Sequence, residues 1–148
     1  MIRTVTDLDR CRYLWERAVG RRGLFGLWDV RACFQRHYNH TPRFVVSEAD
    51  GRIRGLCPLS EISDCGYLGC FPGETHKGKT WLEQNPLIAD TPELLAEMLA
   101  GGSGPVPLRY LPESCVEGVR AAAVDEVGFL FRPADYDYSF DNYLGAFS

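Results

Sequence analysis

Residues 73–80, with the sequence GETHKGKT, could bind the phosphates of a nucleotide. They match the P-loop pattern G-x-x-x-x-G-K-S/T, in which backbone N–H groups surround the phosphates and the lysine reaches them. The hydroxyl group of the last residue would then bind magnesium. One function open to this chain is therefore nucleotide binding through Gly73, Gly78, Lys79 and Thr80.

A P-loop must follow a buried parallel strand and open a long helix whose N-terminus holds the phosphates. Pro86 comes only six residues after Thr80, and a proline inside a helix costs about 3 kcal/mol. A strand that ends in a magnesium-binding aspartate is also needed, but Asp50 lies in a predicted turn and Asp135 follows a proline. We therefore expect no sustained helix after Gly78 and prefer another role for this segment.

The same loop concentrates polar side chains between a predicted strand and a predicted helix, a place where functional groups are often found. Trp81 offers a flat apolar surface with one N–H donor, and Gln84 and Asn85 offer paired donors and acceptors, which suits a sugar, an amino acid or a base. His76 could act as a general base. A polar surface loop anchored by a buried Trp81 is the alternative. The candidate substrate-binding residues are Glu74, His76, Lys79, Trp81, Glu83, Gln84 and Asn85.

The composition places these residues on a folded domain, because 45% of the 148 residues are hydrophobic and 24% are charged, as in ordinary globular proteins. No apolar run approaches the about 20 residues that span a bilayer, so we expect no integral membrane segment and a cytoplasmic location. The net charge of -4 and the scattered basic residues disfavour DNA and RNA as partners. Arg17, Arg21 and Arg22 around Gly20 are expected to lie at a helix end.

Six cysteines are present, and none belongs to a C-x-x-C pair. Cys11, Cys33 and Cys57 fall at apolar positions of periodic segments, so we expect them to be small core residues. Cys65 and Cys70 lie near a histidine, but their spacing and the lack of a second histidine pair argue against a zinc site. We predict that this domain binds no metal and no cofactor.

Periodicity and stop signals predict two helices in the first part of the chain. The first begins after the capping stretch 6–9 and ends at Gly20. The second covers 27–38 and ends at Asn39. The apolar stripe of the second helix consists of Leu27, Val30, Phe34 and Tyr38.

A hairpin over 43–59 is predicted next, because the Asp-Gly pair at 50–51 suits a two-residue type I′ turn. Pro58 cannot donate to a ladder, so the second strand of the hairpin should end near Leu59. A short glycine-rich strand follows over 65–71.

The second half of the chain predicts a helix followed by a β-α-β unit. Thr91 caps a helix that ends at Gly101. A strand over 105–111, a helix over 114–123 and a strand over 127–133 follow. The whole order predicts an α/β (α+β) fold, with a mixed, mainly antiparallel sheet and helices on its faces.

Two helices, a hairpin and a glycine-rich strand in this order resemble the amino-terminal half of the tandem-GNAT acyltransferases, the FemAB-like and cellulose-biosynthesis-type proteins. The resemblance rests on Gly55 in the second hairpin strand, on the apolar-Pro-Leu step at 57–59 and on the stretch YLGCFPG at 67–73. It covers nearly all of the chain and implies a GNAT-like fold.

The end of the chain resembles the start of the family's second half, which has an F-x-x-Y-L-x-x-x-S helix; Phe140 and Ser148 occupy its ends. The resemblance therefore implies a GNAT-like domain over 1–135 and either the start of a truncated second half or a linker over 136–148. The alternative is a non-catalytic interaction domain that docks a partner through the acidic, aromatic segment 135–143.

The resemblance also implies a role in acyl or aminoacyl transfer to a cell-envelope or exopolysaccharide substrate, with a saccharide or peptide acceptor. It implies an acyl-CoA or aminoacyl-tRNA donor for the parent protein, bound by a carboxy-terminal GNAT half that is the partner of this domain. The family's pyrophosphate loop, Q/R-x-x-G-x-G/A, is not found, since residues 52–57 come closest but end in Cys57. We therefore expect this domain to shape the acceptor site, to bind no donor and to be inactive alone.

Overall fold

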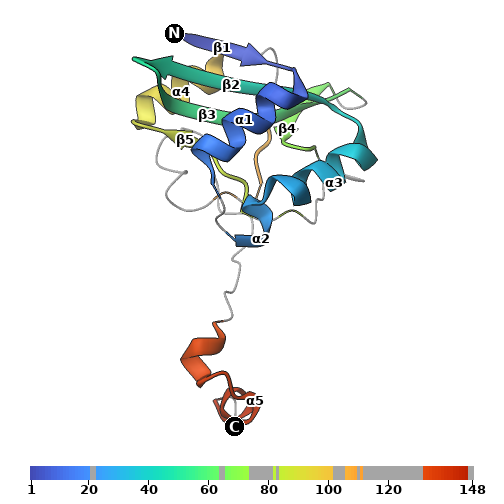
Figure 1. Ribbon diagram of the computed structural model, residues 1–148, viewed down its shortest axis with the longest axis vertical. Coiled ribbons are helices and arrows are strands. Elements are labelled where there is room, and N and C mark those ends of the chain that lie inside the picture. The colour runs from blue at the N-terminus through green and yellow to red at the C-terminus, as the bar shows by residue number, and fades with distance from the viewer. Residues whose placement is uncertain are drawn as a thin grey trace.

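The computed structural model describes residues 1–20, 23–63, 66–73, 82, 84–101, 106–109, 111 and 132–146. Among the helices in these ranges, none is long and apolar enough to cross a membrane. The elements, shown in Figure 1, are β1 (Ile2–Val5), α1 (Leu8–Ala18), α2 (Gly23–Gly26), α3 (Trp28–Tyr38), β2 (Thr41–Ala49), β3 (Arg52–Ile62), β4 (Tyr67–Cys70), β5 (Ile88–Ala89), α4 (Pro92–Ala100), the 3-10 helix η3 (Pro133–Tyr136) and α5 (Phe140–Gly145).

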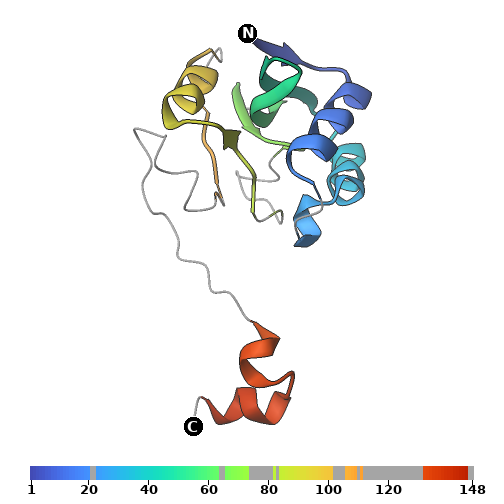
Figure 2. The ribbon, with the colours of Figure 1, turned by 60° about the vertical axis from the view of Figure 1, so that its left-hand side comes forward.

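The strands form one five-stranded sheet in the order β1-β2-β3-β4, with β5 paired to β3 as well. Every pairing between these strands is antiparallel. Helices α1 and α3 lie on one side of the sheet and α4 lies on the other, as Figure 2 shows. The predicted α/β (α+β) fold, with a mainly antiparallel sheet and helices on its faces, is confirmed.

The hairpin between β2 and β3 forms at the predicted turn. Asp50 and Gly51 both have positive φ angles, 52° and 72°, which a type I′ turn requires. Pairing continues from this turn to Thr41 and Glu61, with one irregularity after Ser47. The two strands are therefore the longest in the sheet and form its centre.

The prediction that Pro58 ends its strand near Leu59 is wrong, because β3 continues to Ile62. The carbonyl group of Pro58 accepts a hydrogen bond from the N–H group of Phe71. In an antiparallel ladder the N–H and C=O groups of one residue point to the same neighbour, so the nitrogen of Pro58 faces away from β2. The missing donor therefore costs no bond to β2, where Phe44 is its opposite residue.

The helix caps agree with the sequence signals to within one residue. Asp7 caps α1 by accepting a hydrogen bond from the N–H group of Arg10, and Asn39 closes α3 in the left-handed conformation. Thr91 caps α4 by accepting from the N–H group of Leu94. Such side-chain caps satisfy N–H groups that have no partner inside the helix.

One strand of the structure was not predicted, and three predicted elements differ from the structure or lie outside the described residues. Strand β1 was not predicted, and the strand predicted over 105–111 is wrong at 106–109 and 111, which belong to no helix or strand. The helix predicted over 114–123 lies outside the described residues. Of the strand predicted over 127–133, only the last two residues are described, and Pro133 begins η3 instead.

The two faces of the sheet carry different side chains. The face under α1 and α3 is rich in aromatic rings, and its core consists of Val5, Cys11, Leu14, Trp15, Val19, Trp28, Phe44, Val46, Leu56 and Phe71. The face under α4 is aliphatic, and its core consists of Val45, Cys57, Leu59, Leu68, Leu87, Leu95 and Met98.

Helix α3 packs on the sheet through a face that the sequence did not predict. Its buried residues are Trp28, Arg31 and Gln35, whereas the predicted apolar stripe over 27–38 is only half-buried. Cys33 is exposed, so the prediction that it belongs to the core is wrong. Arg31 and Gln35 occupy the buried face of α3 because their side chains form hydrogen bonds beneath the helix, as described below.

The segment 132–146 forms η3 and α5, which contact each other. The rings of Tyr136 and Tyr143 meet edge to face with their centroids 5.3 Å apart. Tyr138 and Phe140 remain 81% and 70% exposed. The predicted domain boundary after residue 135 stays a prediction.

Candidate functional site

The most distinctive site in the structure is built around Arg31, whose side chain is completely buried under α3. Its Nε donates a hydrogen bond to the carbonyl oxygen of Phe25 at 2.7 Å. One terminal nitrogen donates to the carbonyl oxygen of Phe71 at 2.9 Å and to Oδ1 of Asn85 at 2.7 Å. The other lies 3.4 Å from the carbonyl oxygen of Gln84. One guanidinium group therefore joins three separate parts of the chain.

Burying the charged guanidinium group of Arg31 costs free energy, so its burial depends on the hydrogen-bond partners around it. Loss of solvent lowers the pKa of Arg31 to about 10, because the interior disfavours the charged form. The guanidinium carbon lies 5.2 Å from the centre of the Trp15 ring, close enough for a cation–π attraction. Arg31 remains charged at neutral pH and is held by carbonyl oxygens and by an aromatic ring.

Asn85 is the second fixed point of the site and is 2% exposed. Its Oδ1 accepts the hydrogen bond from Arg31, and its Nδ2 donates to the carbonyl oxygen of Arg109 at 2.8 Å. The same Nδ2 lies 3.4 Å from the carbonyl oxygen of Leu82. Both ends of the side-chain amide are therefore used within the protein.

Together these contacts hold both ends of the polar segment that the sequence singled out. The chain enters this segment at Phe71 and leaves it at Gln84 and Asn85, and Arg31 contacts all three. Fixing the ends of a loop on a rigid scaffold is how many proteins position binding residues. The arrangement therefore fixes, beside the sheet, the two points that residues 74–83 connect.

The first end of the segment is held a second time, near Gly73. This glycine has a φ of 121°, which only glycine adopts readily. A Cβ atom there would overlap the imidazole ring of His40 and lie 3.1 Å from Cδ1 of Ile62. His40 is itself held by Gln35, whose Nε2 donates to its carbonyl oxygen at 2.6 Å. The Oε1 atom of Gln35 is buried and has no hydrogen-bond partner among the residues that the structure describes.

The structure places only two of the seven predicted site residues. Gln84 is exposed and in the left-handed conformation, with a φ of 56°. Asn85 is buried and bonded to Arg31, which brings these two neighbours to the base of the loop. Their role in substrate binding stays a prediction. The other predicted residues, Glu74, His76, Lys79, Trp81 and Glu83, lie outside the described residues.

The P-loop interpretation meets two structural obstacles. Strand β4, which precedes the motif, is antiparallel to β3, whereas a P-loop follows a parallel strand. Leu82 and residues 84–87 are described and belong to no helix, so the long helix that holds the phosphates is missing there. Gly73 is described, while the other motif residues, Gly78, Lys79 and Thr80, lie outside the described residues.

Sequence reasoning missed Arg31, which is the centre of the site. The residue lies three positions after Trp28 and four before Gln35, so these three share one face of α3. That spacing indicates a shared helix face, but the stripe over 27–38 is more apolar and was therefore predicted to be the buried face. The partners could not be foreseen, because Asn85 is 54 residues away in the sequence.

A cavity of about 320 Å³ lies beside this site, between α1 and the start of α3. Trp15 and Trp28 line it together with Asp29 and the ion pair of Arg12 and Glu16, whose atoms are 2.8 Å apart. The volume is at the lower end of small-ligand sites. No cluster of three potential metal ligands occurs among the residues that the structure describes.

Comparison with known protein families, with curated proteins and with solved structures gives no match for this chain.

Proposed function

We propose that this chain is the amino-terminal, acceptor-side domain of an acyl- or aminoacyltransferase that acts on a cell-envelope or exopolysaccharide substrate. One observation carries the proposal: Arg31 and Asn85 fix both ends of the polar segment 74–83 against the sheet. A loop with fixed ends can position a saccharide or peptide acceptor at a low entropic cost. Trp81 and the exposed side-chain amide of Gln84, three positions later in the sequence, supply the chemistry for such an acceptor.

The order of elements supports this proposal. Two longer helices, a long antiparallel hairpin and a short glycine-rich strand follow one another as the resemblance to the tandem-GNAT acyltransferases implies. Fold alone does not determine function. The polar loop between β4 and β5 supplies the site-level support.

The donor, an acyl-CoA or an aminoacyl-tRNA, is assigned to the carboxy-terminal half of the parent protein. Residues 52–57, the nearest match to the pyrophosphate loop, lie inside β3 and pair with β2. A Cβ atom at Gly55 would meet the side chain of Met98 and the carbonyl oxygen of Ile88. The backbone of this stretch pairs with β2, and Gly55 and Leu56 also pair with β5, so its N–H groups do not form an open cradle for a pyrophosphate.

Ligand-observed NMR with the whole chain tests the proposal. The probes are chito-oligosaccharides, a lysine-containing pentapeptide, coenzyme A and ATP with magnesium. We expect binding of a saccharide or peptide probe that Trp81→Ala abolishes and Tyr138→Ala, a change at an exposed aromatic outside the loop, leaves unchanged. No binding of either acceptor probe, or binding of coenzyme A, would contradict the proposal. Binding of ATP that Lys79→Ala removes would favour the P-loop instead.

The exposure of Tyr138 and Phe140 favours a second candidate function, that of a non-catalytic interaction domain. A partner that loses affinity after Tyr138→Ser and Phe140→Ser, but not after Trp81→Ala, would establish it. Large exposed aromatic side chains are enriched at protein interfaces, and Asp137 and Asp141, which flank the two aromatics in the sequence, would favour a basic partner surface.

A further inference from the structure

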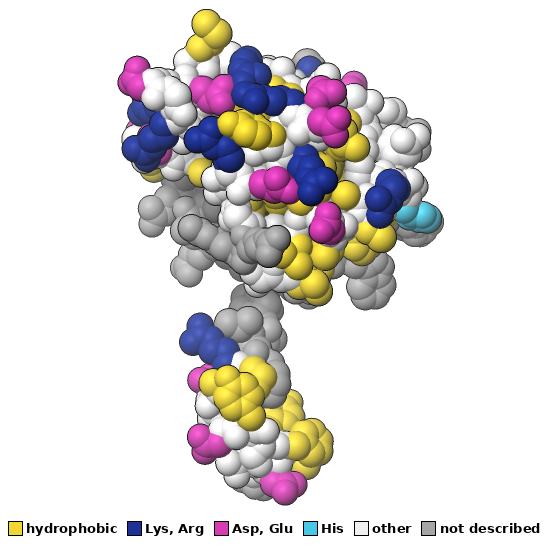
Figure 3. Space-filling model, viewed as in Figure 1, with side chains coloured by type: hydrophobic (Ala, Val, Ile, Leu, Met, Phe, Trp, Pro, Cys, Tyr) yellow, Lys and Arg dark blue, Asp and Glu magenta, His cyan; other side chains and the backbone are white. Residues whose placement is uncertain are grey.

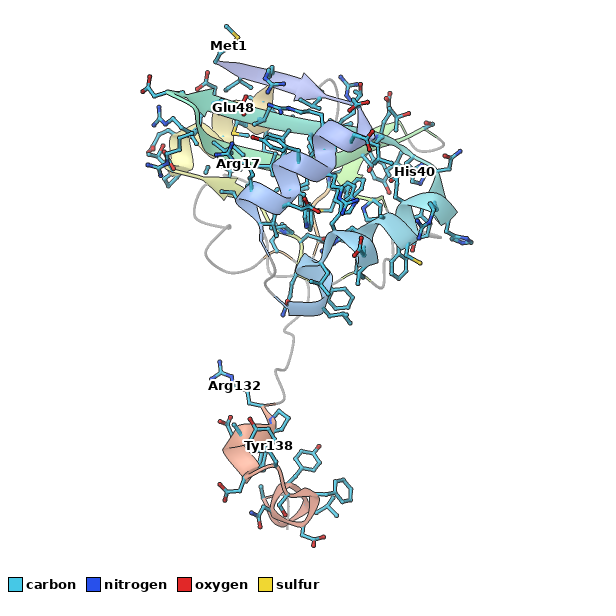
Figure 4. All side chains as sticks on the ribbon, viewed as in Figure 1. Met1, Arg17, His40, Glu48, Arg132 and Tyr138 are labelled. Atoms are coloured by element: carbon cyan, nitrogen blue, oxygen red, sulfur yellow. The ribbon has the colours of Figure 1, made fainter. Side chains whose placement is uncertain are left out.

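Three arginine side chains gather around one carboxylate on the outer flank of α1. Arg3 of β1 forms an ion pair with Glu48 of β2 at 2.5 Å, and Arg10 of α1 approaches the other oxygen of Glu48 at 3.9 Å. Figure 4 shows Glu48 and Arg17 on the same face of the molecule. We call Arg3, Arg10, Arg17, Tyr13 and Glu48 the basic flank.

Tyr13 joins the third arginine to this group. The guanidinium carbon of Arg10 lies 4.5 Å from the centre of the Tyr13 ring, and that of Arg17 lies 5.5 Å from it. Arg17 also donates a hydrogen bond to the hydroxyl oxygen of Tyr13 at 2.6 Å. The tyrosine thus holds two guanidinium groups close together, so part of the entropy cost of ordering them for a ligand is already met.

The basic flank carries more positive than negative charge, although the whole chain has a net charge of -4. Three guanidinium groups face one carboxylate, and the pKa of Glu48 is lowered by the hydrogen bond from Arg3 and by the charges of Arg3, Arg10 and Arg17. Nearby Asp7 caps α1, and Glu16 is paired with Arg12. Figure 3 shows Arg side chains, with Asp and Glu side chains among them, on the surface formed by β1, β2 and α1.

The shape of this surface favours a long ligand over a small ion. The side chains of Arg3 and Arg10 are 39% and 44% exposed, and the cavities at Trp15 and at Arg43 do not include the basic flank. A small anion needs an enclosing pocket to displace its hydration. A row of guanidinium groups on an open surface instead matches repeating negative charges, because each guanidinium can bind a carboxylate or phosphate in a bidentate manner.

We propose that the basic flank binds an acidic polysaccharide and that the acceptor of this domain is such a polymer. The inference rests on the proposed function, which assigns this chain to the acceptor side of a transferase. It adds the charge of the acceptor and a second contact surface, outside the polar loop. Each ion pair is weak because it is exposed, so several repeating units must contribute together.

Binding to immobilised polygalacturonate, with its fully methyl-esterified form as the neutral probe, tests the inference. We expect the whole chain to bind the acidic polymer and not the ester, and to lose affinity between 50 and 200 mM salt, as screening of exposed charges requires. The double variant Arg10→Gln/Arg17→Gln should bind about tenfold more weakly. The matched control is Arg52→Gln/Arg54→Gln, which removes the same charge from two arginines that share Asp90.

Equal losses in the two double variants would overturn the inference, because they would show an effect of net charge alone. Binding to phosphatidylglycerol vesicles but not to polygalacturonate would also overturn it and would indicate a lipid surface. Thermal unfolding of both variants shows whether each still folds. If chito-oligosaccharides bind through Trp81 and the basic flank is silent, the proposed function stands and this inference fails. If the polymer binds through the basic flank while Trp81→Ala has no effect on any probe, the binding surface inferred here stands and the proposed function fails.

Discussion

The two faces of the sheet are built on different principles. Beneath α4 the core is aliphatic, and Met98 and Leu59 belong there to the same cluster of buried residues. Beneath α1 and α3 the core is aromatic and encloses Arg31, with the rings of Trp28 and Phe71 stacked 5.4 Å apart. Aliphatic packing is not directional, whereas hydrogen bonds and ring contacts are. The difference shows that one face supplies stability, while the other also fixes the two ends of the polar segment 74–83.

The largest expected effect is on the directional face. Arg31→Ala should lower the free energy of unfolding by about 4 kcal/mol, because it leaves buried carbonyl groups without donors. Urea unfolding measures the loss. Trypsin cleavage at Lys77 and Lys79 should also become faster under native conditions, since the ends of the segment are no longer tied. Arg36→Ala, an exposed arginine on the same helix, serves as the control and should change neither quantity.

On the aliphatic face, Leu59→Ala should lower the free energy of unfolding by about 3 kcal/mol through the lost burial and the cavity that remains. Leu59 is 1% exposed, while Leu8, the control, is 40% exposed. Trypsin cleavage at Lys77 and Lys79 should stay slow until global unfolding. If Leu59→Ala accelerates this cleavage as much as Arg31→Ala does under native conditions, the two faces do not differ in the way described.

Gly73→Ala tests whether the loop end is fixed by backbone geometry as well as by Arg31. We expect a loss of about 2 kcal/mol, because an alanine side chain is strained at this φ and would overlap His40. Gly101, at the end of α4, has a φ of -73° and accepts a Cβ atom without a clash. Its replacement by alanine should be close to neutral in the same urea experiment.

The smallest expected effect lies outside both cores, at Glu48. Its folded-state pKa is lowered from 4.5, first by the hydrogen bond from Arg3. The unfolded chain therefore binds the proton more readily, so the contribution to stability is present above pH 4.5 and is lost as the pH falls through the folded-state pKa. Glu48→Gln should cost less than about 1 kcal/mol at pH 7, since the pair is partly exposed.

Unfolding curves at pH 7 and below pH 4 measure the loss at Glu48, and the difference between wild type and Glu48→Gln should shrink at the lower pH. Glu97→Gln, a change at an exposed position on α4, is the control. A difference that grows in acid would contradict the assigned ion pair with Arg3.

The features that the sequence predicted are those with local signals. The turn at Asp50, the cap at Thr91 and the left-handed end of α3 at Asn39 each depend on a few neighbouring residues. The α+β class followed from their order. Such signals need no knowledge of the tertiary structure.

The features that the sequence did not predict depend on distant partners. Strand β1 exists because it pairs with β2, from Ile2 opposite Ser47 onward. Pro58 is tolerated in β3 because its nitrogen faces away from β2, while its carbonyl group accepts a hydrogen bond from Phe71. Arg31, and not the predicted apolar stripe, lies on the buried face of α3, because its side chain bonds to partners that lie 40 and 54 residues away in the sequence. Local propensity cannot anticipate such contacts, since tertiary context overrides it.

Both strands that bracket the polar segment pair with the same strand, β3. Cys70 of β4 lies opposite Leu59, and Ile88 of β5 lies opposite Leu56, only three positions along. The chain between β4 and β5 therefore leaves β3 and returns to it at nearly the same point of that strand. Lengthening such an excursion is inexpensive, since doubling it costs only about 0.6 kcal/mol. The length and sequence of the segment between β4 and β5 can therefore change while the sheet remains intact.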